Sequence, residues 1–211
     1  WIRRIDPPYP YRKSNDVTQS IFIHIPKNAG TSLLAAIGAP QRGRLHVDYS
    51  HFKKADPERF EKYYKFAVVR DPMERISSIY RYLSTGGNQD ADDIAIKCLL
   101  EAQSSNLDEF VMDFLNPSRI SCWNMLRPQS YFICDRMGNV CVDFVLKLER
   151  LEEDYRVLKS HIPTLPASLQ KLNRSQRGET ESVYSDAVRK RIKELYSVDY
   201  ELFYSGQILD E

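Results

Sequence analysis

Short apolar runs alternate along the chain with stretches that have the spacing of amphipathic helices. Residues Ile21–Ile25 are β-branched or aromatic apart from one histidine, as in a buried strand, and Pro26 ends the run because proline cannot extend a sheet ladder. Thr31 and Ser32 favour a helix start before the apolar Leu33. The pattern predicts a strand, a tight loop and a helix.

The same succession recurs at residues 65–83. Phe66–Val69 is a continuous apolar run of the kind found in fully buried strands, and Arg70 follows at its carboxyl end. Asp71 is a suitable N-cap, and Pro72 fits the first helical position, where its missing N–H costs nothing. Arg70 is therefore expected at the edge where open α/β sheets bind ligands.

The remaining pattern continues the alternation. Helices are expected at 57–64, at 90–100, from Asn106, over 149–160 and after Ser185, and strands at Ser130–Cys134 and Val140–Leu148 around the turn 135–139. Residues 117–129 have the character of a loop, and residues 1–19 that of an extended N-terminal arm. The sequence predicts a three-layer α/β fold with a mostly parallel sheet, as a single domain over 20–211 after the arm.

Composition excludes some classes of function. The chain has 211 residues with 30 Lys+Arg against 29 Asp+Glu, so no overall positive field indicates a nucleic-acid partner. No apolar run is long enough to cross a membrane. If the chain is complete, a cytoplasmic protein is expected, and if an N-terminal anchor was trimmed, a location in the Golgi lumen is the alternative.

The four cysteines have no C-x-x-C spacing, so no zinc site is expected. Cys134 and Cys141 flank the predicted hairpin turn, and both a pair facing each other and two reduced thiols are compatible with their positions.

The first loop, Pro26–Ser32, combines a lysine, a glycine and a helix start, which together suit the binding of an anion. It is not a Walker A loop, because Lys27 precedes Gly30 instead of following it. The order Pro-Lys-Asn-Ala-Gly-Thr-Ser instead resembles the phosphosulfate-binding loop of sulfotransferases that use 3′-phosphoadenosine-5′-phosphosulfate (PAPS).

Further segments extend this resemblance in order from Ile21 to Tyr204. VVRDPMERISSIY is similar to the family's V-R-[ND]-P-x-x-R-x-x-S-x-Y, with Ser78 eight residues after Arg70. YFICDRMGNVCVDFVLKLERLEEDY and LNRSQRG resemble segments of the carbohydrate-type branch, found in Golgi and bacterial enzymes, as does the later LYSVDYELFY. The chain therefore resembles a carbohydrate-type, PAPS-dependent sulfotransferase.

The resemblance implies a P-loop-like strand–loop–helix and assigns roles to particular residues. Lys27 would assist the leaving nucleotide, and the 5′-phosphate would be held by backbone N–H groups and hydroxyls of Asn28, Ala29, Gly30, Thr31 and Ser32. Arg70 and Ser78 would bind the 3′-phosphate, and the loop with Arg174, Ser175 and Arg177 would close over it or remain solvated. No metal is needed, and 3′-phosphoadenosine-5′-phosphate (PAP) would be the product.

An acceptor hydroxyl needs a general base, for which histidine is the usual choice near pH 7. The family's base lies between the two nucleotide segments, which leaves His46 and His51 because His24 falls inside the first strand. His46 is the first choice and His51 the second.

Three other residues have two interpretations each. Arg75 would touch phosphate or pair with Asp71, Glu149 would orient the site or cap a helix, and Trp123 would stack on a ligand or lie in the core.

The leading hypothesis is transfer of a sulfuryl group to a hydroxyl, most plausibly of a saccharide or glycoconjugate. A kinase or other phosphotransferase is the alternative from another reaction class, and a nucleotide-binding module without catalysis is a third.

Overall fold

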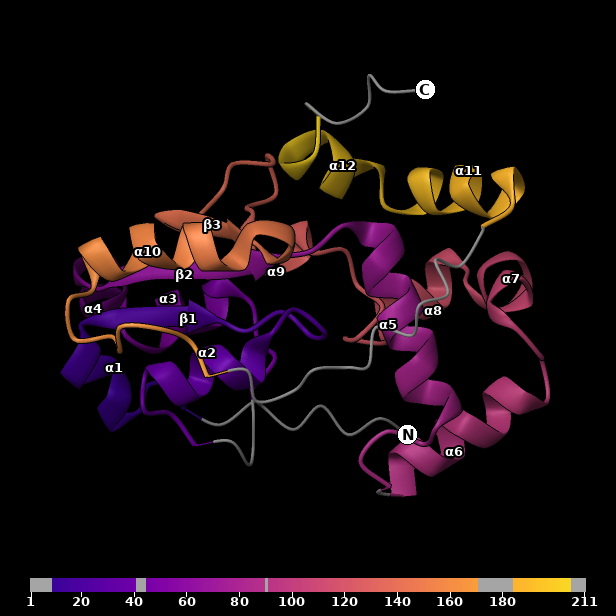
Figure 1. Ribbon diagram of the computed structural model, residues 1–211, viewed down its shortest axis with the longest axis horizontal. Helices are drawn as coiled ribbons and strands as arrows, with labels where there is room; N and C mark the ends of the chain where they lie inside the picture. Colours follow the sequence, from indigo (N-terminus) through magenta and orange to yellow (C-terminus); the bar gives the residue numbers. More distant parts are fainter. Residues whose placement is uncertain (1–8, 41–44, 90, 171–183, 206–211) are drawn as a thin grey trace. The chain divides into compact units, whose positions relative to one another are not determined.

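The computed structural model describes residues 9–40, 45–89, 91–170 and 184–205. They group into two compact units, 9–69 with 129–170 and 70–128 with 184–205, which are described separately below. Figure 1 labels the elements of both.

The first unit is built on a parallel sheet of three strands in the order β1-β2-β3. These strands are β1 (Ser20–Ile23), β2 (Tyr64–Val69) and β3 (Phe144–Lys147). Phe22 pairs with Phe66, and Phe66 with Phe144, so aromatic residues from all three strands share one face. The parallel sheet confirms the predicted α/β class.

Helices cover both faces of this sheet. On the face that carries Phe22 and Phe66, the core is completed by α2 (Gly30–Ala36) and α10 (Leu151–His161), which lie on the near side in Figure 1. On the opposite face Phe60 of α4 (Pro57–Lys62) packs beside Lys65, whose Nζ lies 5.3 Å from its ring centroid. The remaining helices of the unit are α1 (Lys13–Thr18), α3 (Tyr49–Ala55), α9 (Ser130–Ile133) and the 3₁₀ turn η2 (Leu148–Arg150).

Two acidic residues fix the ends of β3. The Asp143 carboxylate accepts from Lys65 N at 2.7 Å and forms an ion pair with Lys65 Nζ at 3.0 Å. The buried Asp154 accepts from Lys147 N at 2.7 Å. Asp143 and Asp154 of VDFVLKLERLEED therefore have structural roles in holding β3.

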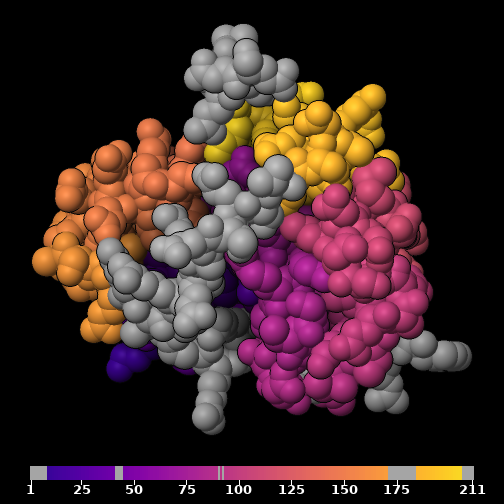
Figure 2. Space-filling view, turned by 45° about the vertical axis from the view of Figure 1, so that its right-hand side comes forward, coloured from indigo at the N-terminus to yellow at the C-terminus, as the bar shows by residue number. Residues whose placement is uncertain are grey.

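The second unit is helical. It comprises α5 (Pro72–Ser84), α6 (Ala91–Glu101), α7 (Leu107–Glu109), the π-helical turn η1 (Phe110–Phe114), α8 (Pro117–Cys122), α11 (Asp186–Leu195) and α12 (Ser197–Phe203). Its core joins Ile76 and Ile79 of α5 to Phe110 and Phe114 of η1 and to Ile192 of α11. In Figure 2 the yellow surface of α11 and α12 adjoins the pink surface formed by residues around η1.

Capping residues place the helices of this unit where the sequence predicts them. Asp71 accepts from Glu74 N at 3.0 Å with Pro72 at the first helical position, as expected. Asn106 accepts from Glu109 N at 2.9 Å, and Glu109 accepts in return from Ser105 N at 2.7 Å.

Four local predictions are wrong. Residues 13–18 of the supposed extended arm form α1, and Pro117–Cys122 forms α8, which starts where Asn116 accepts from Arg119 N at 3.0 Å. The predicted strand Ser130–Cys134 is instead the short helix α9 followed by an isolated bridge between Cys134 and Val140. The predicted strand over 140–148 is reduced to β3. The prediction of one domain over 20–211 stays a prediction.

Candidate functional site

The loop between β1 and α2 has an unusual backbone. Lys27 has φ 70° and Ala29 has φ 53°, so two non-glycine residues lie in the left-handed region on either side of Asn28. A residue with a Cβ pays about 1 kcal/mol or more for this conformation. Surrounding contacts must therefore hold the loop in this shape.

Asn28 supplies those contacts. Its side chain is 1% exposed, and its Nδ2 donates to Val68 O at 2.8 Å and to Gln129 Oε1 at 2.6 Å. Within the described part of the chain no donor reaches Asn28 Oδ1, so the amide orientation is set by its two acceptors. Asn28 ties the loop to the end of β2 and to the start of α9.

His24 lies directly after β1, at the base of the same loop. Its imidazole is 6% exposed and stacks on Phe22 with ring centroids 5.5 Å apart. A Cβ built on Gly30 would overlap the His24 ring, so glycine is required at position 30 by the ring and not by its own φ. From the sequence His24 is expected to be a residue of the first strand, and no local signal in the chain reveals its contact with Gly30.

His46 packs against His24. The two ring centroids are 4.2 Å apart, and His46 Nδ1 lies 3.1 Å from the backbone oxygen of His24. A carbonyl oxygen only accepts, so Nδ1 carries the hydrogen and the lone pair of a neutral His46 is on Nε2. This is the tautomer in which Nε2 acts as a base.

His51 is the second candidate base. It is the third residue of α3, whose N-cap Asp48 accepts from Ser50 N at 2.8 Å, and it is partly buried. The structure therefore places His46 on the segment that contacts the loop and His51 on the following helix.

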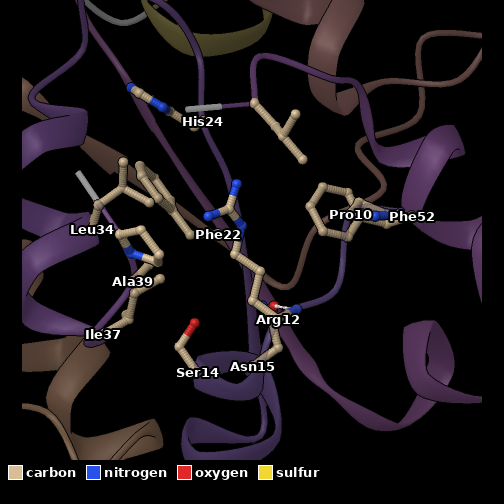
Figure 3. A pocket seen from close by; sticks show the side chains of 12 residues that line it. Pro10, Arg12, Ser14, Asn15, Phe22, His24, Leu34, Ile37, Ala39 and Phe52 are labelled. Carbon is tan, nitrogen blue, oxygen red and sulfur yellow. Dashed lines mark hydrogen bonds between the residues drawn. The ribbon is translucent and has the colours of Figure 1, made fainter. Parts of the chain in front are cut away.

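A small cavity borders His24 in the first unit (Figure 3). It has a volume of about 50 Å³ and is lined by Phe22, Leu34 and Phe52 among others. The guanidinium of Arg12 points into it, toward Phe22. This volume holds a few waters and is too small for a sugar ring.

Arg70 and Ser78 belong to the second unit. Arg70 follows β2 directly in the chain and forms an ion pair with Glu74, with Nη2 and Oε2 3.1 Å apart. Ser78 is a buried residue of α5, two turns after Pro72. Lys27, Asn28 and Gly30 are in the first unit, so each half of the predicted nucleotide site is described by itself, and the site stays a prediction.

Arg75 has a structural role. It is 1% exposed, and its Nη1 and Nη2 donate to Arg127 O at 2.9 Å and to Met125 O at 3.0 Å. Tyr196 donates to Leu126 O at 2.8 Å, so three consecutive carbonyls of one loop are held. Burial lowers the pKa of Arg75, while the nearby Tyr196 and Asp199 oppose that shift.

The other predicted site residues lie elsewhere or outside the described chain. Arg174, Ser175 and Arg177 fall outside the described residues. Glu149 is exposed on η2, and Trp123 packs edge-on against Phe114 with ring centroids 5.5 Å apart, as a core residue does. The four cysteines are free thiols.

The described residues also bear on metal sites and membrane spans. They contain no group of three or more His, Cys, Asp or Glu side chains able to hold a metal ion. Across the same residues, none of the helices combines the length and apolar character that a membrane span requires.

Comparison with known proteins identifies the family to which the chain belongs. No curated protein and no solved structure matches the chain significantly. A family model described as "Sulfotransferase family" matches residues 15–205, which includes the loop after β1, the segment after β2 and both C-terminal helices. This match covers most of the chain, and the protein belongs to the sulfotransferase family.

Proposed function

We propose that this protein transfers a sulfuryl group from PAPS to a hydroxyl of a saccharide or glycoconjugate, with His46 as the general base. The observation that carries the proposal is the hydrogen bond from His46 Nδ1 to the His24 carbonyl. It puts a histidine of defined tautomer beside the loop that contains Lys27.

The proposed donor site begins at the loop after β1. Sulfotransferases generally use PAPS, and the sequence of the loop between β1 and α2 resembles a phosphosulfate-binding, P-loop-like element, which supports the proposal. Backbone N–H groups of Asn28–Ser32 and the hydroxyls of Thr31 and Ser32 would hold the 5′-phosphate. Lys27 would stabilise the negative charge that develops on the departing phosphate oxygen.

Arg70 and Ser78 would bind the 3′-phosphate. A guanidinium forms charge-assisted, bidentate hydrogen bonds with phosphate, which separates PAPS from nucleotides that lack this group. The ion pair with Glu74 is exposed on the glutamate side, and ion pairs open to solvent contribute little to stability, so it is not an obstacle.

The transfer is an in-line displacement that balances without a further reactant. The acceptor oxygen forms a bond to sulfur while the bond from sulfur to the 5′-phosphate oxygen breaks, and that oxygen keeps the electron pair. The hydroxyl proton goes to His46 Nε2. Positioning and charge stabilisation supply most of the rate in reactions of this type.

The saccharide acceptor rests on the resemblance of the hairpin and C-terminal segments to the carbohydrate-type branch. This is an argument by analogy and says nothing of the position that is sulfated.

The donor is tested by calorimetric titration with PAP, ADP and AMP. Wild-type protein should bind PAP at least tenfold more tightly than ADP, and Arg70→Ala should remove this preference. Arg81→Ala is the matched control, because it removes the same charge from an exposed position later in α5. Preference for ADP, or no effect of the 3′-phosphate, would contradict the proposal and favour a phosphotransferase.

The base is tested by turnover of ³⁵S-labelled PAPS with desulfated glycosaminoglycan oligosaccharides. His46→Ala should lower kcat about 100-fold or more with PAP affinity unchanged, as expected for loss of a general base. His51→Ala should retain most of the turnover. The reverse result would make His51 the base, and PAP binding without turnover in any variant would favour a binding module.

A further inference from the structure

Gly30, His24 and His46 form a contact series in the first unit. The His24 ring occupies the space where a Cβ of residue 30 would be, and the His46 ring lies 4.2 Å from it, centroid to centroid. Gly30, at one end of this series, belongs to the proposed phosphosulfate-binding loop, and His46, at the other end, is the proposed base.

We propose that the His24 imidazole is a positioning residue that sets the place of His46 relative to the loop. The inference rests on the proposed function, because it takes His46 as the base. His24 acts through two contacts: its carbonyl fixes the tautomer of His46, and its ring fixes the plane in which that tautomer is held.

The His24 ring lies in close contact with the loop at Gly30. Gly30 begins α2, so its position follows from the loop that Asn28 anchors to Val68 and Gln129. A ring that touches this backbone cannot move toward the loop without displacing it. Because His46 packs on that ring, the position of the ring also sets the distance between His46 and the loop.

The cavity beside His24 offers space in which a displaced ring can move. Its volume is about 50 Å³, and His24 is one of its lining residues. A side chain added at position 30 would drive the ring from its present position, and His46 would lose its packing partner. A shift of about 1 Å at a reacting group can cost about 100-fold in rate.

A purely structural role for His24 predicts different results. His24 also stacks on Phe22, so it contributes to the core of the unit. If that were its whole role, replacing it would lower thermal stability and leave turnover of the folded protein unchanged. Measurements that separate kcat, PAP affinity and the state of His46 therefore distinguish the two roles.

The first experiment compares His24→Ala and His24→Phe with wild type. We expect His24→Ala to bind PAP within about twofold of wild type and to lose about 100-fold in kcat, both with the oligosaccharide acceptor and in release of sulfate to water. His24→Phe keeps a ring in place and should recover at least tenfold of that loss. Equal kcat for His24→Ala and wild type, or no recovery in His24→Phe, would overturn the inference.

The matched control is His161→Ala. His161 also stacks on an aromatic ring of the first unit, Tyr64, with centroids 4.9 Å apart, and is exposed at the end of α10. Its replacement removes an imidazole stack of the same kind and should leave kcat within twofold of wild type.

A second readout does not need an acceptor. The ¹⁵N resonances of the His46 imidazole in the PAP-bound protein should show one neutral tautomer with hydrogen on Nδ1. His24→Ala keeps the backbone carbonyl but removes the ring that holds the His46 imidazole against it, so the resonances should shift toward a mixture of tautomers. In His161→Ala they should be unchanged. An unaltered His46 spectrum in folded His24→Ala would overturn the inference without reference to turnover.

The contact itself is tested by combining substitutions. Gly30→Ala should reduce the melting temperature more in wild type than in a His24→Ala background, because the added Cβ then has space. Equal effects in the two backgrounds would show that the ring does not abut Gly30. If His46→Ala keeps full turnover, the proposed base is wrong; if it loses turnover and His24→Ala does not, only the positioning role fails.

Discussion

Replacement of the buried Arg75 by methionine should strongly destabilise the second unit. The change removes the donors to Met125 O and Arg127 O. This loss lowers the free energy of unfolding by about 1 kcal/mol for each carbonyl. It also removes a positive charge near Asp199, which is fully buried. Breaking a buried ion pair costs about 3–5 kcal/mol, which sets the upper limit, so the expected decrease in the free energy of unfolding is about 2–5 kcal/mol.

Equilibrium unfolding in urea measures this effect. Trp123 packs against Phe114 in the same unit, so its fluorescence reports on the structure around Arg75. Arg81→Met is the control on the same helix and should change the free energy of unfolding by less than about 0.5 kcal/mol.

Two outcomes would refute the reasoning. A loss below about 1 kcal/mol for Arg75→Met would mean that water replaces the guanidinium at the carbonyls and at Asp199. Additive effects of Arg75→Met and Asp199→Asn in the double variant would mean that the two charges do not interact.

Three further predictions concern the loop, a helix cap and a turn. Ala29→Gly should raise the free energy of unfolding, measured in urea, by about 0.5–1 kcal/mol, because glycine adopts φ 53° without strain. Ala35→Gly inside α2 should lower it by about 1 kcal/mol in the same assay. Asp71→Ala should cost about 1 kcal/mol in the same assay through loss of the α5 N-cap, and Asp71→Asn should cost less; equal costs would contradict a capping role. The pKa of Asp135 is lowered, chiefly by its hydrogen bond from the Asn139 side chain, so its stabilising contribution is present above the unfolded pKa and is lost as the pH falls through the folded value. Asp135→Asn should therefore lower the urea midpoint at pH 6 and have less effect near about pH 2.5, and a constant difference would contradict the reasoning.

The elements predicted correctly have strong local signals. The apolar run at Phe66–Val69 and the Asp71-Pro72 helix start define β2 and α5 within a few residues. Asn106 with Glu109 marks α7, and Ser185 marks α11, where its Oγ lies 3.4 Å from Val188 N. For each of the three helices one side chain caps a backbone group of its own helix, so the cause is contained in a few neighbouring residues.

The elements predicted wrongly depend on distant contacts or on local sequence patterns that fit two different structures. Asn116 before proline is typical of a turn and equally of an N-cap, and the structure uses it to start α8. Ser130–Cys134 is rich in aromatic and β-branched residues, yet it follows Gln129, which is fully buried and bonded to Asn28 about 100 residues earlier. That tertiary contact overrides the local strand propensity.

The residues of the candidate site fall into the same two groups, those with a local sequence signal and those defined by a distant contact. Lys27, Gly30 and the Arg70–Ser78 spacing are local, so the sequence alone could name them, and the family match spans the segments that contain them. His46 could be named as a candidate, but its tautomer depends on a carbonyl 22 residues away. His24 could not be found, because alternation along a strand predicts only that a residue is buried and not what it touches.

The loop after β1 shows why a glycine and a histidine must be considered together. Gly30 has no positive φ, so the usual argument for glycine does not apply to it, whereas Ala29 has a positive φ and is not glycine. Backbone conformation alone would favour glycine at 29 and accept alanine at 30. The chain has the opposite arrangement, because the His24 ring occupies the space beside residue 30 while Asn28 holds residue 29 in its strained conformation. Closeness to the His24 ring, and through it to His46, therefore explains the residue at position 30 better than the flexibility of the loop does.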